Sequence, residues 1–157
     1  MSSKLLSLTA AAATTIAAAG FAATQAGGAS PAARAAKLAP VVIHEKFTPL
    51  PCSGAPGQRT TLQMEGCAEK QILKSDNQIN LLAAQIFPIL PSDRARRDFN
   101  AAQRAWLSYR KADCFSMSDV FEGGTEAGVV DAQCVASRNS QRLKDLRTFH
   151  RNLTQTG

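Results

Sequence analysis

The chain has 157 residues, and its 18 Lys and Arg residues against 12 Asp and Glu give a net charge of +6. This length suffices for one domain and not for two, and the positive charge favours an acidic protein, a polyanion or an anionic membrane surface as partner. Aromatic residues make up only 6% of the chain. Because nucleic-acid-binding surfaces interleave aromatic rings with clustered positive charge, the composition argues against a nucleic-acid partner.

Residues 1–26 have the three regions of a secretory signal peptide. Lys4 supplies a positive charge, Leu5–Ala23 carries no charge, and small residues follow from Ala26 to Ala29. We predict cleavage after Ala26 or Ala29, which lowers the net charge to +5 and yields a soluble periplasmic or secreted protein without stable membrane insertion. The alternative is a retained anchor, but a bilayer span needs about 20 strongly apolar residues and this run is mostly Ala and Thr.

Four cysteines lie after the predicted signal peptide: Cys52, Cys67, Cys114 and Cys134. An even number of cysteines in a small exported domain indicates two disulfides. A zinc site would normally include two cysteines close together in sequence, whereas the nearest pair here is fifteen residues apart. We therefore expect no metal site and no cofactor.

The segment 27–57 is rich in Ala, Gly and Ser and contains five prolines, at positions 31, 40, 49, 51 and 56. Proline fixes φ and removes a backbone donor, so this segment cannot form a regular helix. We interpret it as a flexible leader that becomes ordered only near Cys52. Residues 41–43 could pair as a short strand, but a lone strand is marginally stable.

The first helix is predicted over residues 60–89, where apolar residues recur at helical spacing: Met64, Ala68, Ile72, Ile79, Leu82, Ile86 and Leu90. Pro88 and Pro91 end it. Ser92 is the predicted N-cap of a second helix, with Asp93 favourable in its first turn. The second helix extends to about Ser118, and its expected apolar stripe is Ala95, Phe99, Ala102, Trp106 and Tyr109.

A loop is predicted from Ser118 to Asp131, because Gly123 and Gly124 interrupt the helical pattern and Gly128 follows. The third helix is expected over residues 130–153, with Val135, Arg142, Leu146 and Phe149 on one face and Leu143 and Leu153 beside it. Three amphipathic helices joined by two short connections predict an all-α, up-down-up bundle over residues 58–157.

The second predicted helix contains the segment AQRAWLSYR at residues 102–110, followed by Asp113, Cys114, Gly123-Gly124, Cys134, Arg138 and Arg142. The segment QMEGCA at residues 63–68 precedes it, with Asp76 and Asn80. From Cys52 to Leu153 this ordered series resembles the LprI-type lysozyme-inhibitor domain, a family of small exported helical proteins. The resemblance implies a protein partner, possibly a lysozyme, and inhibition of that enzyme.

Most of the motif is interpreted as structural. Gln103, Trp106, Arg110 and Cys114 share one strip of the second helix. We expect Trp106 to be a core anchor beside a disulfide, and Arg110 to pair with a carboxylate such as Asp76 or Asp113. The other members of the structural motif are Tyr109, Arg138 and Arg142. The alternative is direct contact of this strip with a partner.

Four cysteines allow three disulfide pairings. The shortest loops favour Cys52–Cys67 and Cys114–Cys134, and the second of these would close the connection between the last two helices. Such a bridge stabilises by roughly 3 kcal/mol in the chain-entropy model.

The bridged loop is the candidate binding site, since a loop held at both ends loses little entropy on binding. Its residues are Asp119, Phe121, Glu122, Gly123, Gly124, Thr125 and Glu126. The alternative is a simple turn in which the glycines supply positive φ. We predict no enzymatic activity, because nothing places His44 or His150 beside a nucleophile or a second ligand. The alternative function is an envelope-binding module with affinity for anionic surfaces or polymers.

Overall fold

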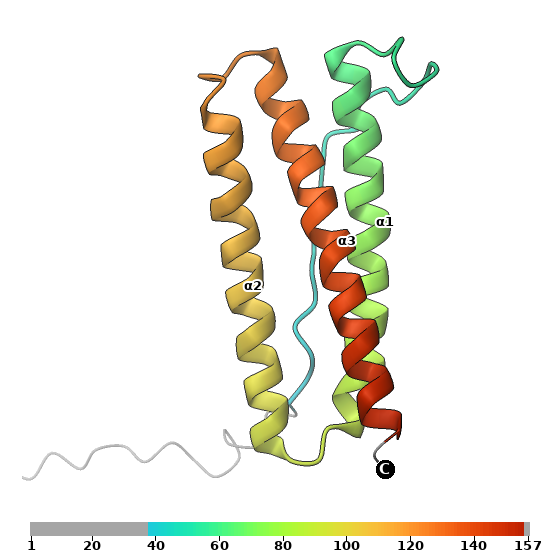
Figure 1. The fold of residues 1–157 in the computed structure, drawn as a ribbon, viewed down its shortest axis with the longest axis vertical. Helices are drawn as coiled ribbons and strands as arrows, with labels where there is room; N and C mark the ends of the chain where they lie inside the picture. The colour runs from blue at the N-terminus through green and yellow to red at the C-terminus, as the bar shows by residue number, and fades with distance from the viewer. Residues whose placement is uncertain (1–37, 156–157) are drawn as a thin grey trace, which may run out of the picture. The chain divides into compact units, whose positions relative to one another are not determined.

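The computed structural model describes residues 38–155, which form three long helices and no strand. Helix α1 spans Thr61–Ile89, α2 spans Asp93–Asp119 and α3 spans Thr125–Gln155, running in alternating directions (Figure 1). The predicted all-α, up-down-up bundle is confirmed. The predicted signal peptide and the first part of the predicted leader, to residue 37, lie outside the described residues. Within the described part, no helix combines the length and apolar character needed to cross a membrane.

The first two helices begin and end where local chemistry dictates. At the start of α1, the Thr60 side chain accepts a hydrogen bond from the Gln63 backbone, and the Gln63 side chain accepts one from the Thr60 backbone. Ser92 caps α2 by accepting a bond from the Ala95 amide at 3.1 Å. Pro88 lies in the last turn of α1, and Leu90 after it is extended. The predicted boundaries of both helices are therefore confirmed to within one residue.

The third helix begins at Thr125, five residues before the predicted start at Val130. The prediction was wrong because Gly128 was taken as the end of a loop. Gly128 instead lies inside α3 at a close approach to α1, where an added Cβ would lie 2.6 Å from a carboxylate oxygen of Glu65. This glycine therefore makes room for a neighbouring side chain and does not end a helix.

The N-terminal segment, residues 38–50, is an extended strap that joins α1 to α2 (Figure 1). Two asparagine side chains each bind its backbone through both a donor and an acceptor. Asn100 of α2 donates to the Ala39 carbonyl at 2.8 Å and accepts from the Val41 amide at 3.0 Å. Asn80 of α1 donates to the Ile43 carbonyl at 3.0 Å and accepts from the Ile43 amide at 2.8 Å. These four bonds satisfy backbone groups of Ala39, Val41 and Ile43 as a neighbouring strand would.

The prediction that the chain becomes ordered only near Cys52 is therefore wrong for residues 38–51. The Ile43 side chain is 8% exposed and belongs to the main apolar core. The composition of the segment could not reveal this order, because the side chains that bind its backbone belong to α1 and α2, far away in the sequence. The three helices and the N-terminal segment together make up the bundle.

The core consists of two apolar clusters separated by a polar layer. The larger cluster lies toward the α1–α2 connection and contains Ile43, Ile79, Ala83, Ile86, Phe87, Leu90, Phe99, Leu143 and Leu146. The smaller cluster lies nearer the start of α1 and α3 and contains Ala68, Ile72, Ala132 and Ala136. Between them along the helices lie Ser75, Asp76 and Asn139, all buried. The predicted disulfides Cys52–Cys67 and Cys114–Cys134 are both confirmed.

The buried face of α2 differs from the predicted apolar stripe. Ala102 and Tyr109, two members of that stripe, are exposed. The residues of α2 that are buried are Phe99, Asn100, Gln103, Arg110, Cys114 and Ser118. Most of them are polar, because this face covers the polar layer and the N-terminal segment and not an apolar core alone. A search for apolar periodicity could not find such a face.

We expect Asn80→Ala and Asn100→Ala each to destabilise the fold by about 1–3 kcal/mol, because each leaves a buried or half-buried backbone group without its partner. Asn80→Ala should also speed hydrogen exchange at the Ile43 amide, and Asn100→Ala at the Val41 amide, both measured by NMR. Asn77→Ala removes an exposed asparagine from the same helix as Asn80 and serves as the control. Unchanged protection of Ile43 in Asn80→Ala would contradict this role.

Candidate functional site

The connection between α2 and α3 is a tight turn closed by its own backbone. The Phe121 amide donates to the Ser118 carbonyl at 3.0 Å, and the Gly124 amide donates to the Phe121 carbonyl at 2.8 Å. Glu122 and Gly123 have positive φ values of 49° and 75°. Gly123 adopts this conformation at no steric cost, whereas Glu122 does so as a side-chain-bearing residue. The turn is therefore defined and projects a glutamate from its tip.

The predicted loop residues all lie at this end of the bundle, on three consecutive pieces of chain. Asp119 is the last residue of α2, Phe121 to Gly124 form the turn, and Thr125 and Glu126 open α3. The turn exposes apolar as well as acidic groups, since Val120 is 77% and Phe121 39% exposed. Asp119, Glu122 and Glu126 make no ion pair within residues 38–155. Their negative charges are therefore free to face a partner.

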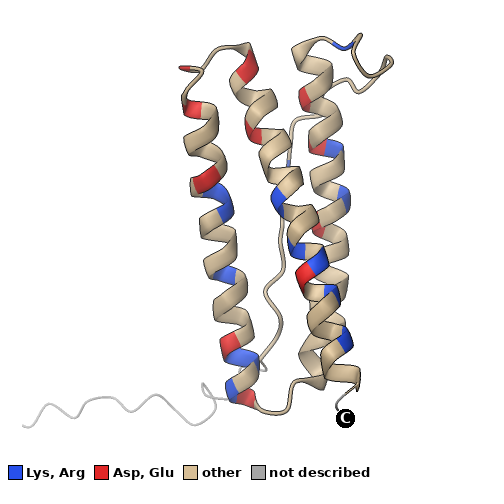
Figure 2. Cartoon of the chain, viewed as in Figure 1, with Lys and Arg blue, Asp and Glu red and all other residues tan. Residues whose placement is uncertain are grey.

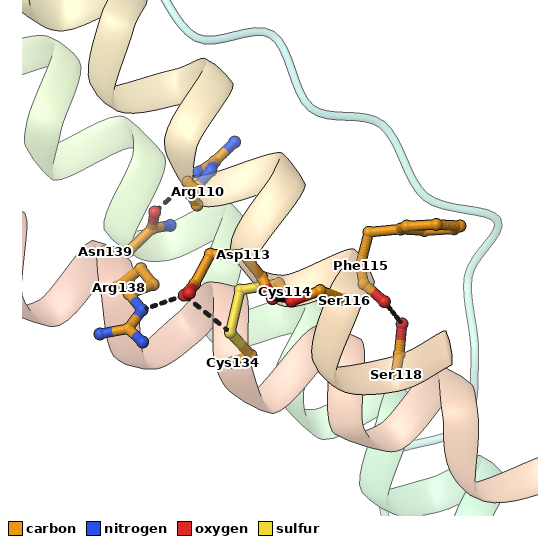
Figure 3. The surroundings of a disulfide bond; sticks show 9 residues. All are labelled: Arg110, Asp113, Cys114, Phe115, Ser116, Ser118, Cys134, Arg138 and Asn139. Atoms are coloured by element: carbon orange, nitrogen blue, oxygen red, sulfur yellow. Dashed lines mark hydrogen bonds and ion pairs between the residues drawn. A yellow bond between two sulfur atoms is a disulfide. The ribbon is translucent and has the colours of Figure 1, made fainter. Parts of the chain in front are cut away.

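The Cys114–Cys134 disulfide joins α2 to α3 (Figure 3), five residues before the end of α2 and nine residues after the start of α3. One residue before Cys114, the Asp113 carboxylate accepts a hydrogen bond from the Arg138 Nε at 2.7 Å. The Arg138 guanidinium also lies over the exposed Tyr109 ring, 5.9 Å from its centroid. The disulfide and the ion pair together hold α2 against α3 where both approach the turn.

Arg110 lies at the centre of the polar layer and connects all parts of the fold. One guanidinium nitrogen donates to Asp76 of α1 at 3.1 Å and to Asn139 of α3 at 2.7 Å. The other terminal nitrogen donates to Glu45 of the N-terminal segment. The Asn139 amide donates in turn to Ser75 at 2.8 Å and to Asp76 at 2.9 Å. Of the two carboxylates considered for Arg110 from sequence, the structure selects Asp76, and Asp113 pairs with Arg138.

Asp76 is the most constrained carboxylate of this layer. Its side chain is 4% exposed, and its Oδ2 atom is buried without a hydrogen-bond partner. Burial raises the pKa of Asp76, because it removes water from the charged form, while the charge and hydrogen bond of Arg110 and the Asn139 hydrogen bond act in the opposite direction. Arg110 is therefore the group that makes an ionised Asp76 tolerable in the interior.

Trp106 is placed differently from the expectation for this motif. Its ring is half-buried at the edge of the larger core cluster, and the Arg110 and Arg142 guanidinium carbons lie 5.1 Å and 5.6 Å from the ring centroid. It lies eight residues before Cys114, about 12 Å along the helix axis, so it is not packed beside the disulfide. Arg142 is held by Gln103, whose Oε1 accepts from its Nε at 2.8 Å. The ring therefore contacts two cations and is not a fully buried anchor.

The charges of the molecule are unevenly distributed (Figure 2). Acidic residues gather at the end of the bundle that holds the α2–α3 turn, whereas most Lys and Arg residues lie further along the helices. The carboxylates at this end come from all three helices and the turn, and are Glu65, Glu69, Asp119, Glu122, Glu126 and Asp131. A basic protein thus carries one acidic end, which we call the acidic end below.

Comparison with known proteins decides the family. A family model described as lysozyme inhibitor LprI matches residues 52–146. The chain belongs to the LprI lysozyme-inhibitor family. No curated protein and no solved structure matches it. The two disulfides agree with the extracytoplasmic setting that the family implies.

The LprI match covers both disulfides, the α2–α3 turn and the four helical residues of the polar layer: Ser75, Asp76, Arg110 and Asn139. It leaves out residues 38–51, so the N-terminal segment with Glu45 lies outside the matched region. The importance of this segment was missed from sequence, because its prolines led to the interpretation as a flexible leader. The one available signal was the pair Asn80 and Asn100, polar residues next to the core residues Ile79 and Phe99.

We expect Arg110→Ala to lower the free energy of unfolding by about 3–5 kcal/mol near pH 7, because it leaves Asp76 buried and without a cation. The pKa of Asp76, already raised by burial, should rise further. The folded variant then binds the Asp76 proton more tightly than the unfolded chain does. Its free energy of unfolding therefore falls as the pH rises from the unfolded pKa of this group, about 4, through the folded pKa. The cost of Arg110→Ala should therefore be smaller at pH 4 than at pH 7.

Urea unfolding at the two pH values measures this difference. Arg104→Ala removes an exposed arginine from the same helix and should change stability by only about 0.5 kcal/mol at either pH. An Arg110→Ala variant as stable as Arg104→Ala would show that the polar layer does not depend on this side chain.

Proposed function

We propose that this protein is an inhibitor without catalytic activity of its own, which binds a lysozyme-type muramidase through the acidic end of its bundle. The observation that carries the proposal is the combination of unpaired carboxylates and exposed apolar side chains on a rigid turn. Glu122 and Phe121 lie on the turn itself, and Asp119 and Glu126 flank it. Family membership supports the kind of target.

A rigid turn is suited to obstruct a muramidase. Such enzymes bind a glycan strand in a groove that contains two catalytic carboxyl groups, and an object seated over the groove competes with the strand. The turn here is held by two helices, its own hydrogen bonds and the Cys114–Cys134 disulfide. Little conformational entropy remains to be lost on binding. Exposed Val120 and Phe121 would supply the apolar contact area that most interfaces need at their centre.

Charge explains why the acidic end, and not another face, would make the contact. Many animal lysozymes are basic, so a protein whose full sequence has a net charge of +6 is repelled from them at long range. A concentrated group of carboxylates on one end reverses the sign locally and orients the encounter. The basic remainder would then face away from the enzyme.

Neutralising the turn tests the proposal. We expect the triple variant Asp119→Asn, Glu122→Gln and Glu126→Gln to weaken inhibition by about tenfold or more, measured as clearing of a bacterial cell-wall suspension by a basic lysozyme. Its stability should stay within about 0.5 kcal/mol of the parent because all three positions are exposed. High salt should remove most of the difference between parent and variant, since the Debye length falls to about 3 Å at 1 M.

A matched control comes from the opposite part of the molecule. Asp93→Asn, Asp98→Asn and Asp145→Asn also remove three exposed negative charges, and this variant should inhibit like the parent. Equal loss in both triple variants would mean that net charge and not the acidic end controls binding. Absence of inhibition by the parent against basic and acidic muramidases alike would refute the function. Retention of the parent on anionic vesicles would then favour the envelope-binding alternative.

A further inference from the structure

A cleft of about 880 Å³ opens between α1 and α2 toward the acidic end. It exists because these two helices make few direct contacts with each other and pack mainly against α3. Residues 127–135 of α3 contribute to its lining, and residues 42–47 of the N-terminal segment complete it. A cleft of this size can admit a large side chain together with its neighbours.

The cleft is lined by more negative than positive charge. Its carboxylates are Glu45, Glu65, Glu69 and Asp131, and its cations are Arg110 and Lys111. Glu45 is paired with Arg110, whose remaining hydrogen bonds go to the polar layer. Within residues 38–155, the other three carboxylates make no ion pair and no side-chain hydrogen bond. The lining therefore carries an excess of negative charge.

Packing holds these carboxylates partly away from water. The Glu65 carboxylate lies directly over Gly128 of α3, where any larger residue would displace it. Burial raises the pKa of Glu69, with a smaller contribution from the neighbouring Glu65 charge. Burial also raises the pKa of Asp131, although the positive charge of Arg110 opposes the change. A cation entering the cleft would replace the hydration that these groups have lost.

Apart from His44 and two serines, the rest of the lining is apolar, and among the described residues its carboxylates do not form a metal-binding cluster. Ile72, Leu107 and Val135 contribute aliphatic surface, and Phe47 and Phe115 contribute rings. The Phe115 side chain points away from the disulfide on the side of the N-terminal segment (Figure 3). Within residues 38–155, the only three metal-ligand side chains close enough to share one ion are Asp113, Cys114 and Cys134, and those cysteines form a disulfide. The cleft therefore fits a cation that carries apolar surface of its own.

We propose that this cleft receives a basic side chain of the protein partner, an arginine or lysine next to an apolar residue. The charged head lies among Glu65, Glu69 and Asp131, and the apolar neighbour packs on Phe115, Leu107 and Ile72. The identity of the partner as a muramidase rests on the proposed function, and the chemistry of the occupant rests on the cleft itself. Because the cleft and the α2–α3 turn open at one end, a single partner surface can occupy both.

A short peptide tests the occupant without any muramidase. The probe is acetyl-Arg-Phe-Arg-amide, titrated into the purified protein and followed by amide shifts in ¹H–¹⁵N NMR spectra. We expect shifts at cleft residues such as Ile72, Ser108 and Ala132, and none with acetyl-Glu-Phe-Glu-amide. The variant Glu65→Gln, Glu69→Gln, Asp131→Asn should bind the basic peptide at least about tenfold more weakly. The Asp93, Asp98, Asp145 control variant should bind it like the parent.

A second variant keeps all the charges and changes only their placement. Gly128→Ala should displace the Glu65 carboxylate and weaken peptide binding, while α3 itself gains a better helix former. Thermal melting shows whether each variant is folded. We call the triple variant Glu65→Gln, Glu69→Gln, Asp131→Asn the cleft variant. We expect it to melt no lower than the parent, because burying a neutral amide costs less free energy than burying a carboxylate.

The two proposals fail in different ways. A parent that inhibits no muramidase but binds the basic peptide in the cleft would refute the function and uphold the cleft. The opposite result is that the parent inhibits a muramidase, the cleft variant inhibits equally well, and the basic peptide shifts only amides outside the cleft. That result would refute the cleft proposal and leave the proposed function standing. Equal binding of the basic and acidic peptides would also overturn it, because charge is the basis of the proposed recognition.

Discussion

The buried Arg110 guanidinium is the interaction on which the rest of the structure depends. It is the one side chain of the described residues that donates to α1, α3 and the N-terminal segment at once, through Asp76, Asn139 and Glu45. An arginine fits this position because its planar fork offers several donors in fixed directions, which a lysine does not. A buried ion pair adds little net stability over apolar packing, but removing one partner is expensive. A shift of one helix along another would break these bonds, so we expect the layer to favour one register of the helices.

The same layer explains why the bundle is open at one end. With Arg110 and the N-terminal segment between them, α1 and α2 are held apart and a cleft remains toward the α2–α3 turn. The two disulfides lie at this end, Cys52–Cys67 at the start of α1 and Cys114–Cys134 behind the turn. They restrain the part of the molecule where apolar packing is thinnest, since the cluster there consists of Ala68, Ile72, Ala132 and Ala136. The disulfides thus stabilise this end of the bundle in place of a large apolar core, which would fill the cleft.

Signals that act within a few residues predicted the helices well, whereas contacts between distant parts of the sequence left little trace in it. Capping by Ser92 and the prolines at 88 and 91 set the first helices, because these effects act within a few residues. Gly128 was misread, since a glycine that makes room for Glu65 looks the same as one that ends a helix. The N-terminal segment depends on Asn80 and Asn100, which lie 37 and 59 residues from their backbone partners. Of the site, the turn could be predicted from sequence, whereas the cleft requires the spacing of α1 and α2.

The uneven distribution of charge gives the molecule one acidic end as well as a positive net charge. An anionic surface attracts the Lys and Arg residues along the helices and repels the acidic end, so the two effects act on opposite parts of one rigid body (Figure 2). A basic protein instead attracts the acidic end and repels the Lys and Arg residues along the helices. Affinity for an anionic envelope and affinity for a basic enzyme therefore do not compete for the same surface. In the proposed complex, the exposed carboxylates of the turn would act at a distance, whereas the partly desolvated Glu69 and Asp131 would act mainly on a group that enters the cleft. Under the two proposals, long-range attraction would come from the turn, and discrimination between partners would come from the cleft.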